Sequence, residues 1–264
     1  MQEISLEERK KIVIGILERI HSFCLDNGIK YYLAYGSLIG AIRHSGFIPW
    51  DDDIDLWMFR KDYEHFIKLF SEINDPIYKI SSIHNDTKYN LAFAKVYDSR
   101  TYISDGAYNA PDLGINVDIF PLDLLSDDIN QAKKLLKKIK KYKVLSKLQS
   151  ARIKKERAIY ENLAILIGRI IPRLLIIRKI DTLAQKYDNF SGSRFCGNLT
   201  TLPYGEREIL KKEWFSSITE VAFEGKRFFA PQCYDDILTN IYGDYMKLPP
   251  VEKRIQHANV AFWR

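Results

Sequence analysis

Carboxylates crowd one short stretch of this chain: Asp51, Asp52 and Asp53 are consecutive, and Asp55 follows two positions later. Like charges held this close disfavour one another's ionised form unless a cation neutralises them. A Gly-Ser pair and an Arg-His pair precede the stretch, at positions 36–37 and 43–44. Together these residue types predict a site where a divalent metal ion assists chemistry on phosphates.

The elements that position these carboxylates follow from the residue pattern. Residues 53–58 alternate polar with apolar side chains, which predicts a strand with Asp53 and Asp55 on one face. One or two metal ions could bind there, and a solvated strand edge is the alternative. Residues 91–97 and 115–120 read as further strands, the second with Asp118 opposite its apolar face. An unpaired acid there is costly, so Asp118 either joins the metal site or pairs with Lys95.

Helices and turns are expected before the carboxylates. Ser5 and Glu8 form a capping-box pattern that opens a helix, and residues 26–28 end it. A strand over 29–35 and a helix over 37–44 are predicted next. A helix start after Gly36 would present backbone N–H groups to an anion, so Gly36 and Ser37 are candidates for binding phosphate. An ordinary turn is the alternative.

Charge is distributed unevenly along the 264 residues. The net charge of +6 comes from residues 133–180, which hold 16 Lys/Arg against two acids, whereas the remainder has 24 basic and 32 acidic residues. The carboxylates therefore lie in an acidic body. The basic residues form one segment without aromatics around the site, which argues against nucleic acid. Three scattered cysteines and an N-terminus without a signal-peptide pattern predict a cytoplasmic protein.

Three short motifs together resemble a known superfamily. Gly36-Ser37, Asp53-Ile54-Asp55 and Val117-Asp118-Ile119 are similar to the nucleotidyltransferase pattern, and residues 33–55 and 234–254 resemble the LicD/fukutin phosphotransferase family. The likeness spans residues from about 5 to 257 and is weakest in the middle. It implies an α+β fold, with a nucleotidyltransferase-like mixed β-sheet core flanked by helices. The expected parts are a core at 1–125, a basic helical insertion at 126–190, and a C-terminal part at 191–264 that completes the active site.

The resemblance also implies an activity. Members transfer a phospho-alcohol, most often phosphocholine from CDP-choline, to a hydroxyl of a surface glycan such as teichoic acid, lipopolysaccharide or a capsule precursor. Asp53 and Asp55 would hold Mg²⁺ or Mn²⁺, and Asp118 would complete the metal site and polarise the attacking hydroxyl. The expected donor phosphate contacts are Gly36, Ser37, Arg43 and His44, with Arg43 favoured for its forked donor geometry. Relatives of the fukutin type carry a Cys/His zinc cluster, and its absence from this sequence favours a bacterial type.

Alternatives remain at this point. The alcohol could be ribitol, glycerol or ethanolamine, the enzyme could be an Asp-x-Asp glycosyltransferase using a nucleotide-sugar, or the chain could be a non-catalytic scaffold. Trp50 is a candidate for stacking on a base or on choline, or else it packs beside Pro49. Lys253, Arg254 and His257 either contact phosphate or offset a helix dipole.

The basic segment predicts an amphipathic helix followed by an apolar run at 163–177, which Arg169, Pro172 and Arg173 interrupt. This run is too short and too charged to span a bilayer. We expect a helical arm on the inner face of the cytoplasmic membrane, attracted by anionic lipids and a lipid-linked glycan acceptor. An ordinary helical cap with solvated lysines is the alternative.

Overall fold

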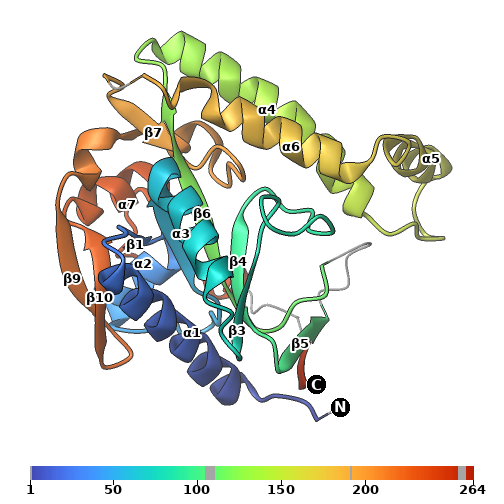
Figure 1. Ribbon diagram of the computed structural model, residues 1–264. Helices are drawn as coiled ribbons and strands as arrows, with labels where there is room; N and C mark the ends of the chain where they lie inside the picture. The colour runs from blue at the N-terminus through green and yellow to red at the C-terminus, as the bar shows by residue number, and fades with distance from the viewer. Residues whose placement is uncertain (1, 105–110, 191, 255–259) are drawn as a thin grey trace.

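The computed structural model of this protein describes residues 2–104, 111–190, 192–254 and 260–264 (Figure 1). Its centre is a mixed sheet in the order β1-β2-β6-β4-β3. These strands are β1 (Tyr32–Leu33), β2 (Asp55–Phe59), β6 (Asn116–Leu125), β4 (Ala94–Asp98) and β3 (Tyr78–Ser81). Only the β2–β6 pair among them is parallel, and helices cover the sheet, so the predicted α+β class is confirmed.

Two helices, α1 (Leu6–Asp26) and α3 (Arg60–Glu72), lie side by side on one face of the sheet (Figure 1). The capping box predicted at the start of α1 is present, since Ser5 and Glu8 bond reciprocally. Phe23 of α1 packs against Phe66 and Phe70 of α3 at ring-centroid distances of 5.6 and 5.0 Å. Val117 and Ile119 of β6 are fully buried, as the alternation predicted, and Asp118 points to the opposite face.

The strands before the active-site loop differ from the prediction. Of the strand expected over 29–35, only Tyr32 and Leu33 form β1 and pair with β2. Helix α2 (Tyr35–His44) begins at Tyr35, where the strand was expected to end. The strand expected from Asp53 begins at Asp55. The Ile54 carbonyl before this strand still accepts a hydrogen bond from the Asp118 backbone N–H at 2.9 Å, and the buried Asp52 carboxylate pairs with Arg9 of α1 at 2.9 Å.

The C-terminal residues extend and flank the sheet. Strand β7 (Phe195–Gly197) pairs with the far end of β6 and with β8 (Leu210–Lys211). Strands β9 (Ile218–Phe223) and β10 (Lys226–Pro231) form a hairpin, and β11 (Val260–Trp263) pairs with β5 (Thr101–Ser104). Helix α7 (Tyr234–Tyr242) packs against α2. Short 3-10 helices occupy 185–187, 205–208, 212–215 and 251–253.

Three helices form an arm that extends away from the sheet (Figure 1). They are α4 (Ile129–Ser150), α5 (Ile159–Gly168) at the far end, and α6 (Arg173–Ala184), which packs along α4. Leu135, Ile139, Ile176 and Ile180 belong to a second hydrophobic cluster near the body. No helix among the described residues combines the length and apolar character of a membrane span. The predicted boundaries at 125 and 190 remain a prediction.

A buried ion network joins this arm to the body. The Arg60 guanidinium at the start of α3 donates to both Asp123 oxygens at 2.7 and 3.0 Å and to Asp181 of α6 at 2.9 Å. Arg60 is 7% exposed and Asp123 is fully buried. Because a buried charge is tolerated only when it is paired and hydrogen-bonded, Arg60 fixes where the base of α6 meets the sheet.

Candidate active site

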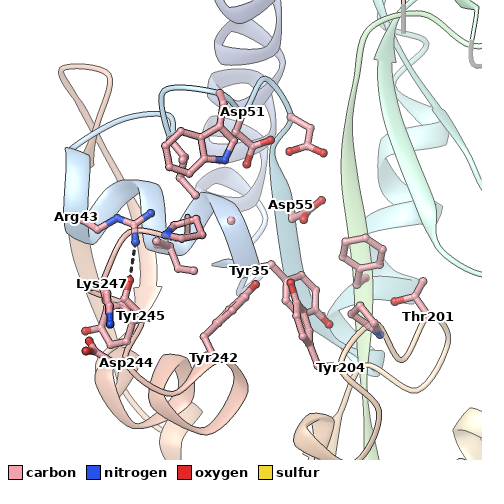
Figure 2. A pocket seen from close by; sticks show the side chains of 18 of the residues that line it. Tyr35, Arg43, Asp51, Asp55, Thr201, Tyr204, Tyr242, Asp244, Tyr245 and Lys247 are labelled. Atoms are coloured by element: carbon pink, nitrogen blue, oxygen red, sulfur yellow. Dashed lines mark hydrogen bonds between the residues drawn. The ribbon is translucent and has the colours of Figure 1, made fainter. Parts of the chain in front are cut away.

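A cavity of about 700 Å³ opens between α2, the loop before β2, and the C-terminal part of the chain (Figure 2). Asp51, Asp53 and Asp55 line it, and so does Gly36 at the start of α2. Arg43 and Lys247 line it as well, from the end of α2 and from the segment after α7. The cavity therefore combines acidic and basic groups contributed by distant parts of the sequence.

The carboxylates of this cavity interact strongly. Burial raises the pKa of Asp55 well above its ordinary value, and the charges of Asp53, Asp118 and Asp51 raise it further. Such repulsion between like charges favours a bound cation. Asp51 also lines the cavity, whereas Asp52 pairs with Arg9 of α1.

Asp118 lies next to Asp55, as the superfamily pattern implies. The two residues are directly opposite in the parallel β2–β6 pair, and Lys95 is opposite Asp118 on its other side. The Lys95 ammonium contacts the Asp118 carboxylate and donates to the Asn116 amide oxygen at 2.8 Å. The predicted pairing of Asp118 with Lys95 is therefore present, and its role in a metal site stays a prediction that its position beside Asp55 allows.

The Gly-Ser pair performs two different tasks. A side chain at Gly36 would place its Cβ 2.9 Å from an Asp51 carboxylate oxygen, so glycine lets the Asp51 side chain lie against the helix start without shifting. The Ser37 hydroxyl accepts a hydrogen bond from the Asp55 backbone N–H at 2.9 Å and so fixes the position of Asp55. Backbone N–H groups in the first helical turn have no partner within the helix, and this keeps the predicted phosphate contact chemically reasonable.

Arg43 and His44 are the basic residues at the end of α2. Arg43 lines the cavity and donates to the Tyr245 carbonyl at 2.6 Å and to the His44 ring at 2.9 Å (Figure 2). Burial, followed by the positive charge of Arg254, lowers the pKa of Arg43. The two guanidinium groups thus repel one another, and a bound anion would relieve this repulsion. His44 contacts Arg43 at the helix end.

Trp50 lines the cavity, and the Arg254 guanidinium lies 5.0 Å from the centre of its ring. Arg254 also donates to the Pro249 carbonyl at 3.0 Å. The Lys253 side chain and all of His257 lie outside the described residues. The predicted binding roles of Trp50, Lys253, Arg254 and His257 therefore remain predictions, and Trp50 already has one cation on its ring.

Several residues that line the cavity were not predicted from the sequence. They include Tyr35, Phe120, Tyr204 and Tyr242. These residues are spread from position 35 to position 242, and nothing in their local spacing signals a common site. Tyr35 adopts a left-handed backbone with φ 45°, which is costly for an aromatic residue. The Tyr35 hydroxyl donates a hydrogen bond to the buried Glu208 carboxylate at 3.0 Å and accepts one from the buried Asn198 amide nitrogen at 3.0 Å.

The carboxylates partly fit a divalent ion. Among the residues that the structure describes, no three His, Cys, Asp or Glu side chains gather closely enough to enclose a metal by themselves. Mg²⁺, however, is commonly bound through one or two carboxylates together with substrate phosphates and water. The crowded Asp53 and Asp55 beside an open cavity fit that mode of binding.

A helix with a Gly-Ser pair in its first turn, an Asp-x-Asp that ends at the start of the next strand, and a third acid on the neighbouring strand define the nucleotidyltransferase class of site. Residues 28–138 match the nucleotidyltransferase domain of the LicD/FKTN/FKRP family. The chain is 32% identical over 263 residues to the lipopolysaccharide cholinephosphotransferase LicD of Haemophilus influenzae, covering 97% of both chains. It is also 41% identical over 58 residues to the mouse ribitol 5-phosphate transferase FKRP, covering 22% of this chain and 10% of that protein.

This chain belongs to the LicD/fukutin family and is a phosphotransferase of that family. The resemblance inferred from its motifs is confirmed. The alternatives of a glycosyltransferase and of a non-catalytic scaffold are set aside by this membership.

Proposed function

We propose that this enzyme transfers a phospho-alcohol, specifically phosphocholine from CDP-choline, to a hydroxyl of a cell-surface glycan such as a lipopolysaccharide, teichoic acid or capsule precursor. The observation that carries the proposal is that one cavity brings Asp53 and Asp55 together with the start of α2 and Arg43. Among possible alcohols, choline is favoured because the relative that matches end to end is a cholinephosphotransferase. Transfer of ribitol, glycerol or ethanolamine phosphate is the alternative.

Phosphoryl transfer needs positioning and charge neutralisation more than covalent help from the protein. In our proposal the N–H groups of Gly36 and Ser37 and the Arg43 guanidinium bind the donor phosphates, with His44 orienting Arg43. Lys253, Arg254 and His257 could add contacts from the tail. Asp118 accepts a hydrogen bond from the attacking glycan hydroxyl and thereby orients it toward the phosphorus atom.

Asp53 and Asp55 would hold Mg²⁺ or Mn²⁺ in this site, and Asp118 would join them by exchanging its contact with Lys95. The ion would neutralise the donor diphosphate and stabilise the departing CMP. Lys95 then keeps its bond to Asn116 and continues to offset part of the negative charge around Asp55.

A panel of CDP-alcohols tests the proposal directly. The protein is incubated with CDP-choline, CDP-ethanolamine, CDP-glycerol or CDP-ribitol and Mg²⁺, and CMP release is followed with and without a candidate glycan. We expect CDP-choline to be consumed fastest, glycan to accelerate its consumption, and mass spectrometry to find a phosphocholine increment on the glycan. Consumption of nucleotide-sugars instead, with a hexose increment, would refute the proposed reaction.

We also propose that the arm attaches the protein peripherally to an anionic membrane, where a lipid-linked acceptor would be found. Helix α5 exposes large apolar side chains, with Ile159 87%, Leu163 53% and Ile167 57% accessible. Ile170, which follows α5, is 77% exposed. The exposed Lys154 and Lys155 precede this tip, and such a combination of apolar and basic groups suits the interface of a bilayer.

Vesicle flotation tests the attachment. Wild-type protein should float with vesicles containing phosphatidylglycerol and much less with phosphatidylcholine vesicles. A variant with the exposed Lys137, Lys138, Lys140 and Lys141 changed to Glu should lose this binding. The matched control changes the exposed body residues Lys11, Lys61, Lys68 and Lys211 to Glu, with the same change in net charge. Equal binding by the arm variant and the wild type would end the membrane proposal.

A further inference from the structure

Aromatic rings form a continuous wall on one side of the catalytic cavity (Figure 2). Tyr35 lies 5.7 Å from Tyr204 and 5.8 Å from Phe120 between ring centroids, and Tyr204 lies 4.8 Å from Tyr242. These residues come from the start of α2, from β6, from the loop after β7 and from α7. Four separate elements therefore supply one aromatic surface, which we call the aromatic wall.

The aromatic wall lines the cavity mainly through Tyr204 and Tyr242, because Tyr35 and Phe120 are only 4% and 7% exposed. The Tyr242 hydroxyl bonds to the Tyr204 oxygen, and the Tyr35 hydroxyl donates to Glu208 at 3.0 Å beneath the wall. Tyr204 remains 37% exposed although it packs between Tyr35 and Tyr242. A polyol would need hydrogen-bonding partners here, because its hydroxyls lose their water on binding. These hydroxyl groups are instead directed to protein partners.

Negative charge lies beside the aromatic wall. Asp51, Asp53 and Asp55 line the same cavity, and the charges of Asp55 and Asp51 act on Tyr204. An aromatic face carries negative electrostatic potential and attracts cations, and the nearby Asp51 carboxylate, which the proposed metal site does not use, strengthens the attraction. Arg43 and Lys247 lie across the cavity from this wall (Figure 2). The cavity is thus suited to a ligand with a cationic end and an anionic end.

We propose that the aromatic wall of Tyr35, Phe120, Tyr204 and Tyr242 is the binding site for a quaternary ammonium group, and so selects a trimethylammonium alcohol over a polyol. This inference rests on the proposed function, since it concerns the alcohol end of the same donor. Trp50 is a poorer site for this group, because the Arg254 guanidinium already lies 5.0 Å from its ring centre and would repel a second cation. Stacking of the cytosine base on the same wall is the competing role.

A pair of donors that differ only in charge tests the inference. CDP-choline is compared with its neutral carbon isostere, in which a tert-butyl group replaces the trimethylammonium group. A cation on aromatic faces gains up to about 2 kcal/mol, so wild-type kcat/KM should favour CDP-choline about tenfold to thirtyfold. Tyr204→Leu and Tyr242→Leu should each lower kcat/KM for CDP-choline about tenfold while changing that for the isostere much less.

Two further measurements separate the ring from its hydroxyl and from base stacking. Tyr204→Phe keeps the ring face and removes the hydroxyl, so it should keep the preference for the charged donor. Competitive inhibition by CMP should stay unchanged in Tyr204→Leu if the wall binds the alcohol. Weakening of CMP inhibition to the same extent as turnover of CDP-choline would instead assign the wall to the base and overturn the inference.

The remaining outcomes separate this inference from the proposed function. Equal turnover of CDP-choline and its neutral isostere would keep the phosphotransfer and overturn the ammonium site. If no CDP-alcohol is consumed, the proposed function fails. Calorimetry then compares the binding of phosphocholine and of its neutral isostere to the same protein, which tests whether the aromatic wall binds an ammonium group. Preference for phosphocholine would support that site, and equal affinity would overturn it.

Discussion

The catalytic cavity and the tip of the helical arm place charged and apolar side chains in opposite ways. Around the cavity, apolar residues such as Leu56 and Ile119 are fully buried, and carboxylates face the open space. At the tip, Ile159 and Ile170 are exposed, with basic residues beside them. The cavity suits a small ligand with a cation, whereas the tip suits an extended apolar and anionic surface. We therefore propose two recognition surfaces of different chemistry in one chain, one on the body and one on the arm that Arg60 joins to it.

The largest expected effect comes from breaking that joint. Arg60→Ala would leave Asp123 and Asp181 buried without their main cation, and this should lower the free energy of unfolding by about 3 to 5 kcal/mol. Arg194→Ala, at a 74% exposed side chain paired with Asp127, should cost at most about 1 kcal/mol. Urea denaturation of both variants measures the difference. A similar loss in both would mean that the arm docks without the buried network.

The next effect distinguishes function from stability within the cavity. Asp55→Asn removes a charge that repels its neighbours, so it should lower kcat about a hundredfold to a thousandfold without lowering the melting temperature. CMP release and thermal unfolding give the two readouts. Asp26→Asn, at an exposed position at the end of α1, is the control and should change neither. Retained activity in Asp55→Asn would exclude this carboxylate from the chemistry.

Buried Glu208 beneath the aromatic wall should make stability depend on pH. Burial raises its pKa from 4.5 to about 7, so between these values the folded protein keeps a proton that the unfolded chain releases. The free energy of unfolding should therefore fall as pH rises through this window, by about 3 kcal/mol from this group. Glu208→Gln should flatten that slope in melting curves recorded at several pH values.

The exposed Glu213 provides the control for this measurement, because Glu213→Gln should leave the slope as in the wild type. An unchanged slope in Glu208→Gln would show that other groups control the pH dependence, and that the carboxyl beneath Tyr35 is not the group that titrates.

The smallest effect is expected at the tip. Leu163→Ser on α5 should change the free energy of unfolding without lipid by less than about 0.5 kcal/mol, because Leu163 is 53% exposed. Ile139→Ala, at a fully buried position of α4, should cost about 2 to 5 kcal/mol. Equal losses in denaturation experiments would show that the tip contributes to the core and is not a separate surface.

Much of the site could be predicted from local pattern. Asp53, Asp55, Gly36 and Arg43 all line one cavity, and Asp118 lies directly beside Asp55. The capping box of α1 and the burial of alternate residues in β6 also followed from sequence. The ion pair between Asp52 and Arg9 did not, because it joins residues whose proximity no local spacing reveals.

The order of residues by itself determined the family, the Asp-x-Asp strand and the basic arm, because helix and strand periodicity and short motifs are local properties. Only the tertiary structure decided that Asp51 enters the cavity while Asp52 does not, that Asp118 contacts Lys95, and that Tyr204 and Tyr242 join Tyr35 in one wall. Those outcomes depend on contacts between segments far apart in the chain, where packing and charge pairing choose among partners that the sequence leaves equivalent.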